Sequence, residues 1–165
     1  MFACGPAERR AGRVRDTARV TRVEAQLGRT IPALPVGDVR AAVTHYRERF
    51  GFEASHVTDD FAVVVRDGAE IHLWGATDSG WRTRGVVEDR PVRSGAESFL
   101  AGTASCRIEA VDVDGLYAEL GAAGVLHPTA RDLVDTDFGT REFATLDLDG
   151  NLLSFFRWVQ AGAPR

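Results

Sequence analysis

The chain has 165 residues, of which 44% are hydrophobic and 27% are charged, and its net charge is −4 at pH 7. These values fit one compact globular unit with a substantial apolar core. No apolar run approaches the roughly 20 residues that a membrane-spanning helix needs, so the sequence predicts no membrane association.

Residues 1–29 differ in charge from the rest of the chain. This segment contains seven arginines and three acidic residues, so its net charge is +4 and that of the remaining residues is −8. The segment lacks the apolar stretch of a secretory signal. We therefore predict a mobile Arg-rich N-terminal extension on a cytoplasmic protein, and no nucleic-acid partner, because arginine runs are usually solvated.

From residue 30 onward the chain contains an internal repeat. Val-Gly-Asp-Val at 36–39 and Val-Asp-Val-Asp at 111–114 each open a segment that ends on glycine and an apolar residue, about 73 residues apart. Self-similarity at a fixed distance indicates a duplicated structural unit. Each copy reads as an apolar segment, a helix and three short strands, which predicts two βαβββ modules.

A helix is predicted near the start of each module. Asp38 and Asp112 stand where an N-cap side chain is expected, and Gly51 and Gly124 stand where a left-handed residue ends a helix. One apolar stripe in each helix is expected to pack on a sheet. The stripes consist of Val39, Val43, Tyr46 and Phe50 in the first helix and Val113, Leu116, Leu120 and Ala123 in the second.

Short strand-like runs follow each helix. In the first module they cover 53–57, 61–65 and 71–74, separated by turn residues at 59–60 and 67–68. In the second module they cover the less regular 126–134, then 141–148 and 152–156, with the last turn at 149–151. The second module therefore repeats the plan of the first.

The sequence lacks the common motifs of catalysis. It has no Gly-rich phosphate loop, no G-x-S-x-G elbow and no H-E-x-x-H pair. Cys4 and Cys106 lack CxxC spacing, so we expect free thiols, with Cys106 a small buried residue.

Several stretches resemble bleomycin resistance proteins, within the vicinal-oxygen-chelate superfamily that also contains glyoxalase I and dioxygenases. The resemblance covers about residues 31–158. It rests on Ile-Pro-Ala-Leu-Pro-Val at 31–36 with Asp38 and Val39, on Phe-Gly-Phe at 50–52, and on the stretches 59–67, 116–120, 139–143 and 149–151.

The resemblance implies an α+β fold in which two βαβββ modules form cup-shaped mixed sheets. The expected single domain spans 30–160, with module 1 at about 30–75, a linker at 76–102 and module 2 at about 103–158. It further implies a homodimer, with residues 30–37 crossing to the partner, since Pro32 and Pro35 suit an exchanged edge arm.

The superfamily's enzymes hold a metal with one residue from the first and one from the last strand of each module. The resemblance places Ile31, His72, Cys106 and Ser154 at these positions, and a one-residue shift would place Pro32 or Ala33, Arg107 and Leu153 there. Only His72 is a good ligand, and a catalytic metal needs about three. We therefore expect no metal and no cofactor, with His72 hydrogen-bonded in the cup.

The resemblance also locates a ligand cleft lined by aromatic and polar groups. The candidate ligand-binding residues are His56, Asp59, Asp60, Phe61, His72, Trp74, Trp81, Arg107 and Phe138. Phe61 is equally compatible with core packing and core packing is favoured for Trp74, whereas Phe138 lies beside a glycine in a turn-like segment, which favours a ligand or dimer surface. Arg107 stands where the family carries a stacking tryptophan, and Trp81 on the linker is a candidate replacement.

The implied function is sequestration of a bleomycin-like ligand without chemical modification. Such antibiotics carry a flat bithiazole, a metal-chelating moiety and a cationic tail, which suit aromatic stacking and an acidic domain. Two alternatives stay open from the sequence: a metal-dependent lyase, isomerase or dioxygenase of the same superfamily, and a binder of another small aromatic metabolite.

Overall fold

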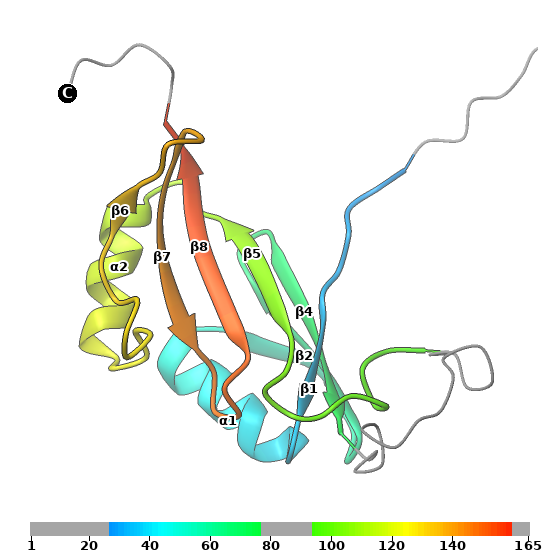
Figure 1. Ribbon diagram of the computed structural model, residues 1–165. Coiled ribbons are helices and arrows are strands. Elements are labelled where there is room, and N and C mark those ends of the chain that lie inside the picture. The colour runs from blue at the N-terminus through cyan, green and yellow to red at the C-terminus, as the bar shows by residue number, and fades with distance from the viewer. Residues whose placement is uncertain (1–26, 77–93, 160–165) are drawn as a thin grey trace, which may run out of the picture.

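A computed structural model describes residues 27–76 and 94–159 (Figure 1). Each half consists of a strand, a helix and three further strands, which confirms the predicted α+β fold of two βαβββ modules. The first half comprises β1 (Ala33–Val36), α1 (Val39–Phe50), β2 (Glu53–Val57), β3 (Phe61–Arg66) and β4 (Ala69–Gly75). The second comprises β5 (Ser105–Glu109), α2 (Val113–Ala122), β6 (Val134–Asp135), β7 (Thr140–Leu146) and β8 (Leu152–Trp158).

Each half forms one four-stranded mixed sheet with the same topology. The strand orders are β1-β4-β3-β2 and β5-β8-β7-β6. The first strand of each module pairs in parallel with the last, and the other pairs are antiparallel. β1 lies beside β4 of its own chain, with Ala33 opposite His72.

The predicted helix signals act as expected. The Asp38 carboxylate accepts a 2.9 Å hydrogen bond from the Ala41 N–H, and Asp112 accepts one of the same length from Gly115. Gly51 ends α1 in the left-handed region with φ 67°.

The second helix ends by a related arrangement. Its last helical residue is Ala122, and Gly124 follows with φ 75°. The Val125 N–H donates to the Leu120 carbonyl, and the Gly124 N–H donates to Gly121. This pair of bonds is the Schellman pattern, in which glycine is preferred because a Cβ opposes the left-handed conformation.

A single apolar core joins the helices to one face of each sheet. Val39, Ala42, Tyr46 and Phe50 are buried on α1, as are Val113 and Leu120 on α2. The strand residues facing them include Leu34, Val36, Ala62, Val64, Ile71, Leu73, Phe143, Leu153 and Phe155. Because side chains alternate along a strand, the remaining residues point away from the helices. We call this second side of each sheet its open face.

A buried polar cluster links the two modules at the turn before β8. Asn151 is fully buried, and its side-chain amide donates 2.9 Å to the Pro35 carbonyl and 2.8 Å to Asp147 Oδ2, while its Oδ1 accepts from the Ala104 N–H. The Tyr46 hydroxyl donates to Asp147 Oδ2 at 3.0 Å. The cluster therefore connects β1 and α1 to the second module.

The segment 126–133 is not a strand in the structure. Leu126 forms one bridge with Thr145, and only Val134 and Asp135 pair with β7. The His127 ring accepts the N–H groups of Thr129 and Ala130, at 3.2 and 3.0 Å, which turns the chain after the bridge. This local competition for backbone donors explains the irregular pattern of the sequence.

Candidate ligand-binding site

Four of the predicted site residues meet on the open face of the first sheet. Phe61 is the centre of this group, with its ring centroid 4.7 Å from Trp74, 5.2 Å from His72 and 5.9 Å from His56. The register explains the grouping, since Phe61 pairs with Trp74 across β3 and β4 and His72 lies two residues before Trp74. We refer to His56, Phe61, His72 and Trp74 as the module 1 aromatic cluster.

Trp74 is the sheltered member of this cluster. A Cβ added to Gly95 would lie only 2.0 Å from the Trp74 ring, so the linker backbone at this residue lies directly against the indole. The Trp74 Nε1 is buried and has no hydrogen-bond partner in the structure. Glycine is needed at position 95 because no side chain fits between this backbone and the ring.

His72 is hydrogen-bonded, as one of the two sequence interpretations required. Its Nε2 lies 3.2 Å from Glu70 Oε1, and the other oxygen of Glu70 accepts a 2.7 Å bond from Arg29. Glu70 thus ties the histidine ring to the arm that precedes β1. The His72 and Phe61 rings meet edge to face, with an interplanar angle of 84°.

Asp59 and Asp60 have local roles at the turn between β2 and β3. Asp59 accepts hydrogen bonds from the Arg40 guanidinium at 2.8 and 3.0 Å. The Asp60 carboxylate accepts a 2.7 Å bond from the Thr58 hydroxyl, which also receives the Phe61 N–H. These contacts shape the turn that leads into Phe61.

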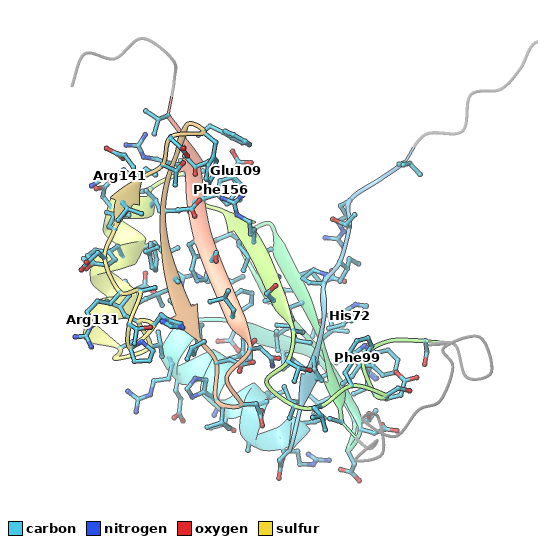
Figure 2. All side chains as sticks on the ribbon, in the orientation of Figure 1. His72, Phe99, Glu109, Arg131, Arg141 and Phe156 are labelled. Atoms are coloured by element: carbon cyan, nitrogen blue, oxygen red, sulfur yellow. The ribbon has the colours of Figure 1, made fainter. Side chains whose placement is uncertain are left out.

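A second group occupies the open face of the other sheet. The Arg107 guanidinium carbon lies 4.4 Å from the Phe156 ring centroid and 5.9 Å from that of Phe138. Trp158 meets Phe156 edge to face at 5.8 Å. We call Arg107, Phe138, Phe156 and Trp158 the module 2 cluster; Figure 2 shows Phe156 at the upper end of β8, with Glu109 beside it.

The sequence prediction included Arg107 and Phe138 but missed Phe156 and Trp158. Both follow from period-2 alternation along β8, because Leu153 and Phe155 are buried and Phe156 and Trp158 are in the alternate positions, which face the other way. The adjacent pair Phe155-Phe156 hides this signal, since one of the two rings is core and the other is on the open face.

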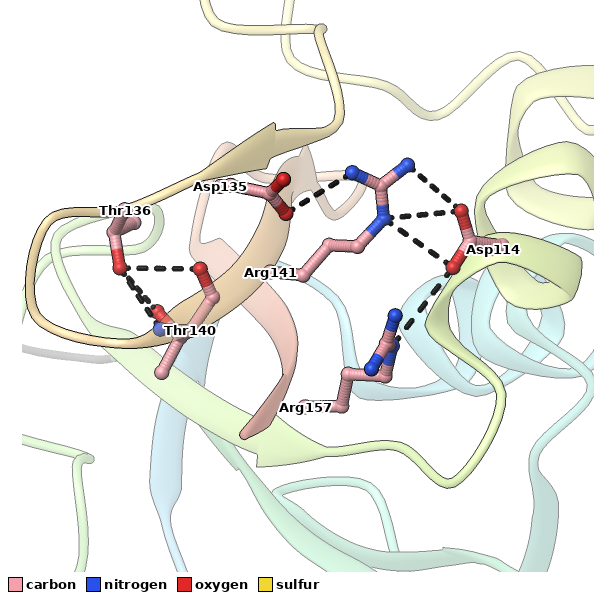
Figure 3. Close-up of polar contacts among 6 residues, drawn as sticks. All are labelled: Asp114, Asp135, Thr136, Thr140, Arg141 and Arg157. Carbon is pink, nitrogen blue, oxygen red and sulfur yellow. Dashed lines mark hydrogen bonds and ion pairs between the residues drawn. The ribbon is translucent and has the colours of Figure 1, made fainter. Parts of the chain in front are cut away.

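Phe138 is carried on the turn between β6 and β7, as predicted. The ring is 59% exposed. The turn is closed by Thr136 and Thr140, whose hydroxyls lie 2.8 Å apart (Figure 3). Gly139, within the turn, has φ 87°. On its other side, Arg141 binds Asp114 of α2 at 2.8 Å and Asp135 at 3.0 Å, which fixes the hairpin on the helix.

A cavity of about 750 Å³ lies between the modules, and Arg107 is the one member of the two clusters that lines it. Phe52, Ile71, Leu116 and Phe155 supply apolar parts of its wall. Glu70 and Arg107 also line it, so it adjoins the glutamate that holds His72 and the arginine that lies over Phe156. The further acidic lining residues are Asp67, Glu109, Asp112 and Glu119.

The four positions at which the superfamily's enzymes hold a metal do not carry a ligand set here. The strand pairing places Ala33 beside His72 and Arg107 beside Ser154. Ile31 and Cys106 are therefore not directly opposite His72 and Ser154. A guanidinium repels a divalent cation, and within 27–76 and 94–159 no three His, Cys, Asp or Glu side chains are grouped to hold one. These residues do not fit a metal.

Cys106 faces the core instead of the open face. It is buried opposite Leu153, and burial, followed by the charge of Asp147, raises the pKa of its thiol to about 11. A thiol in this environment stays protonated at neutral pH, as the prediction of a small buried residue implies.

The predictions for Trp81, for the N-terminal extension and for membrane spans depend on which residues the structure describes. Trp81 lies outside the described residues, as does most of the N-terminal extension. In the described part, no helix has the length and apolar character needed to cross a membrane.

The chain matches known proteins over most of its length. Residues 26–155 match the Glyoxalase/Bleomycin resistance protein/Dioxygenase superfamily. A bleomycin resistance protein of Geobacillus stearothermophilus is 47% identical over 132 residues, covering 80% of this chain and 98% of that protein.

Two solved structures share the fold. The bleomycin-binding protein of Streptomyces verticillus, in complex with copper(II)-bleomycin, is 25% identical with a TM-score of 0.60, covering 80% of this chain and 97% of its own. A glyoxalase/bleomycin resistance protein/dioxygenase from Nocardioides is 22% identical with a TM-score of 0.57, and the match covers 87% of this chain and 91% of that protein. The chain therefore belongs to the glyoxalase/bleomycin resistance protein/dioxygenase superfamily.

Proposed function

We propose that this protein confers resistance by binding a bleomycin-type glycopeptide without modifying it. The observation that carries the proposal is the pair of aromatic clusters on the open faces, with Arg107 at a position where an enzyme of the superfamily would hold a metal. The names of the 47% identical relatives and the copper-bleomycin complex of the S. verticillus protein support it.

The chemistry of the clusters suits such a ligand. A flat bithiazole can stack on Phe61 or Phe138, and each aromatic pair contributes about 0.5–1.5 kcal/mol beyond the burial of its area. The cationic tail is favoured by the −8 charge of the chain after residue 29 and by the acidic residues around the cavity. His56, His72 and Trp74 complete the first face, and Asp59 and Asp60 act by shaping its turn.

We further propose a cytoplasmic homodimer, in which the open face of one chain covers that of its partner. Residues 30–37 are the arm expected to take part in exchange. Should β1 be exchanged, the bonds of Pro35 with Asn151 would join two chains. Mass measurement across a range of concentrations is expected to give the dimer, and monomers at every concentration would contradict it.

Stoichiometric protection of DNA tests the proposal of binding without chemistry. Plasmid cleavage by iron-loaded bleomycin is expected to stop once protein chains equal drug molecules, and drug recovered by denaturing the complex should be unchanged in mass and cleaving activity. Protection by a tenfold lower amount of protein, or recovery of a modified drug, would instead show catalysis.

A further inference from the structure

The cavity between the modules has an apolar floor and an uncovered apolar residue at its edge. The floor is formed by the side chains of Phe52, Ile71, Leu116 and Phe155. Val111, which follows β5, also lines the cavity, and this residue is 103% exposed. A fully exposed valine beside an apolar hollow suits a partner that covers both.

The position of Val111 relative to α2 makes its exposure unusual. Val111 directly precedes the N-cap residue Asp112, and Leu116 is the fourth residue of the helix. Apolar residues at these two positions often pack together as a hydrophobic staple. The full exposure of Val111 shows that it packs on no residue in the described part of the chain. Val111 and Leu116 therefore leave an apolar surface for another segment.

The charge of the cavity indicates which kind of segment fits it. Five acidic residues and three arginines line the cavity, so the lining has a net charge of −2. Each of the three arginines is already in an ion pair with a glutamate. Glu109 is exposed and has no ion-pair partner within 27–76 and 94–159. A basic segment that also carries apolar side chains is therefore the complementary partner.

The chain itself contains such a segment just before the cavity wall. Arg29 lines the cavity and is fixed to Glu70 at 2.7 Å, so the residues before it start beside the cavity. Residues 19–23 have the sequence Arg-Val-Thr-Arg-Val, which combines positive charge with valine side chains. Val23 comes six residues before Arg29, and six extended residues span at most about 20 Å. The segment is therefore long enough to reach across a cavity of this volume.

We propose that residues 19–23 of the N-terminal extension dock in this cavity, on the chain whose β4 pairs with their own β1. Their valines cover Val111 and Leu116, and their arginines meet Glu109 and the other acidic lining residues. The extension is then anchored, whereas the sequence alone predicts a mobile one. The inference goes beyond drug binding, because these residues precede 26–155, the part of the chain that matches the superfamily.

Hydrogen exchange followed by mass spectrometry tests this docking in the full chain. The amides of residues 19–23 are expected to exchange about tenfold more slowly than those of a synthetic peptide of residues 14–27, because docking shields them from solvent. Glu109→Arg combined with Val111→Arg removes the exposed valine and makes the cavity edge positive. This pair of substitutions should lower the protection about fivefold.

A reciprocal pair of substitutions changes the extension instead of the cavity. Arg19→Glu combined with Arg22→Glu should also lower the protection about fivefold. All four substitutions together again place opposite charges face to face, so they should restore the protection to within about threefold of the unmodified chain. If the chain with Glu109→Arg and Val111→Arg fails to fold, the Arg19 and Arg22 pair decides the outcome alone.

Asp132→Arg combined with Val134→Arg is the matched control. These exposed residues are an acid and a valine at the same spacing, and they do not line the cavity, so the protection should be unchanged. The midpoint of urea unfolding is measured for every variant. Docking in this cavity is overturned if the unmodified chain shows no protection, if the Glu109 and Val111 pair does not lower it, or if the control lowers it equally.

Discussion

Phe138→Ala is expected to weaken bleomycin binding by ten- to a hundredfold while leaving the fold intact. Burying a phenylalanine ring against a ligand is worth about 1.5–3 kcal/mol, and each 1.4 kcal/mol is a factor of ten in Kd. The ring is 59% exposed in the free chain, so its removal should change the free energy of unfolding by less than about 0.5 kcal/mol. Titration calorimetry and chemical denaturation measure the two effects.

Leu148→Ala is the matched control for this substitution. Leu148 is 53% exposed and follows the opposite end of β7. The substitution therefore removes a comparable exposed apolar side chain at a distance from Phe138. It should leave the Kd unchanged. Equal Kd values for the Phe138 variant and the unmodified chain would remove Phe138 from the binding site. Phe61→Ala is a less direct test, because that ring also contacts His56, His72 and Trp74.

Asn151→Ala is expected to lower the free energy of unfolding by about 3 kcal/mol. The substitution deprives the partly buried Ala104 N–H of its acceptor and removes the side-chain donor to Pro35 and to Asp147. Unsatisfied buried groups cost about 1–3 kcal/mol each, and bonds to a carboxylate are at the upper end. Urea denaturation followed by circular dichroism gives the value.

Thr44→Ala serves as the comparison for the Asn151 variant. Thr44 donates one hydrogen bond to the Arg40 carbonyl on the exposed side of α1, so its loss should cost less than about 0.5 kcal/mol. A change below 1 kcal/mol for Asn151→Ala would show that the polar cluster does not hold the two modules together.

The module plan was predictable because its signals are local. The helix ends depend on single residues and short-range hydrogen bonds, which can be recognised from the sequence alone. These residues are Asp38, Asp112, Gly51 and Gly124. Strand alternation likewise leaves Phe61 and His72 on the face turned away from the helices. The repeat then made each module support the assignment of the other.

The site was only partly predictable because strand register is a non-local property. A shift of one residue exchanges the two faces of a sheet, and this shift separates Cys106, which is buried, from Arg107, which lies on the open face. Asp59 and Asp60 stay predicted ligand groups, and their bonds with Arg40 and Thr58 were not predictable because those partners come from an adjacent helix and turn. Phe156 was hidden because its neighbour Phe155 is also aromatic.

The measurement that tests the central claim most directly is calorimetric titration of chelator-treated protein with metal-free and with Cu²⁺-loaded bleomycin. The proposed function predicts submicromolar binding of one drug per chain in both forms, because stacking on the two clusters needs no metal held by the protein. Absence of heat with either form, confirmed by equilibrium dialysis of the same samples, would contradict the proposal that this protein binds bleomycin.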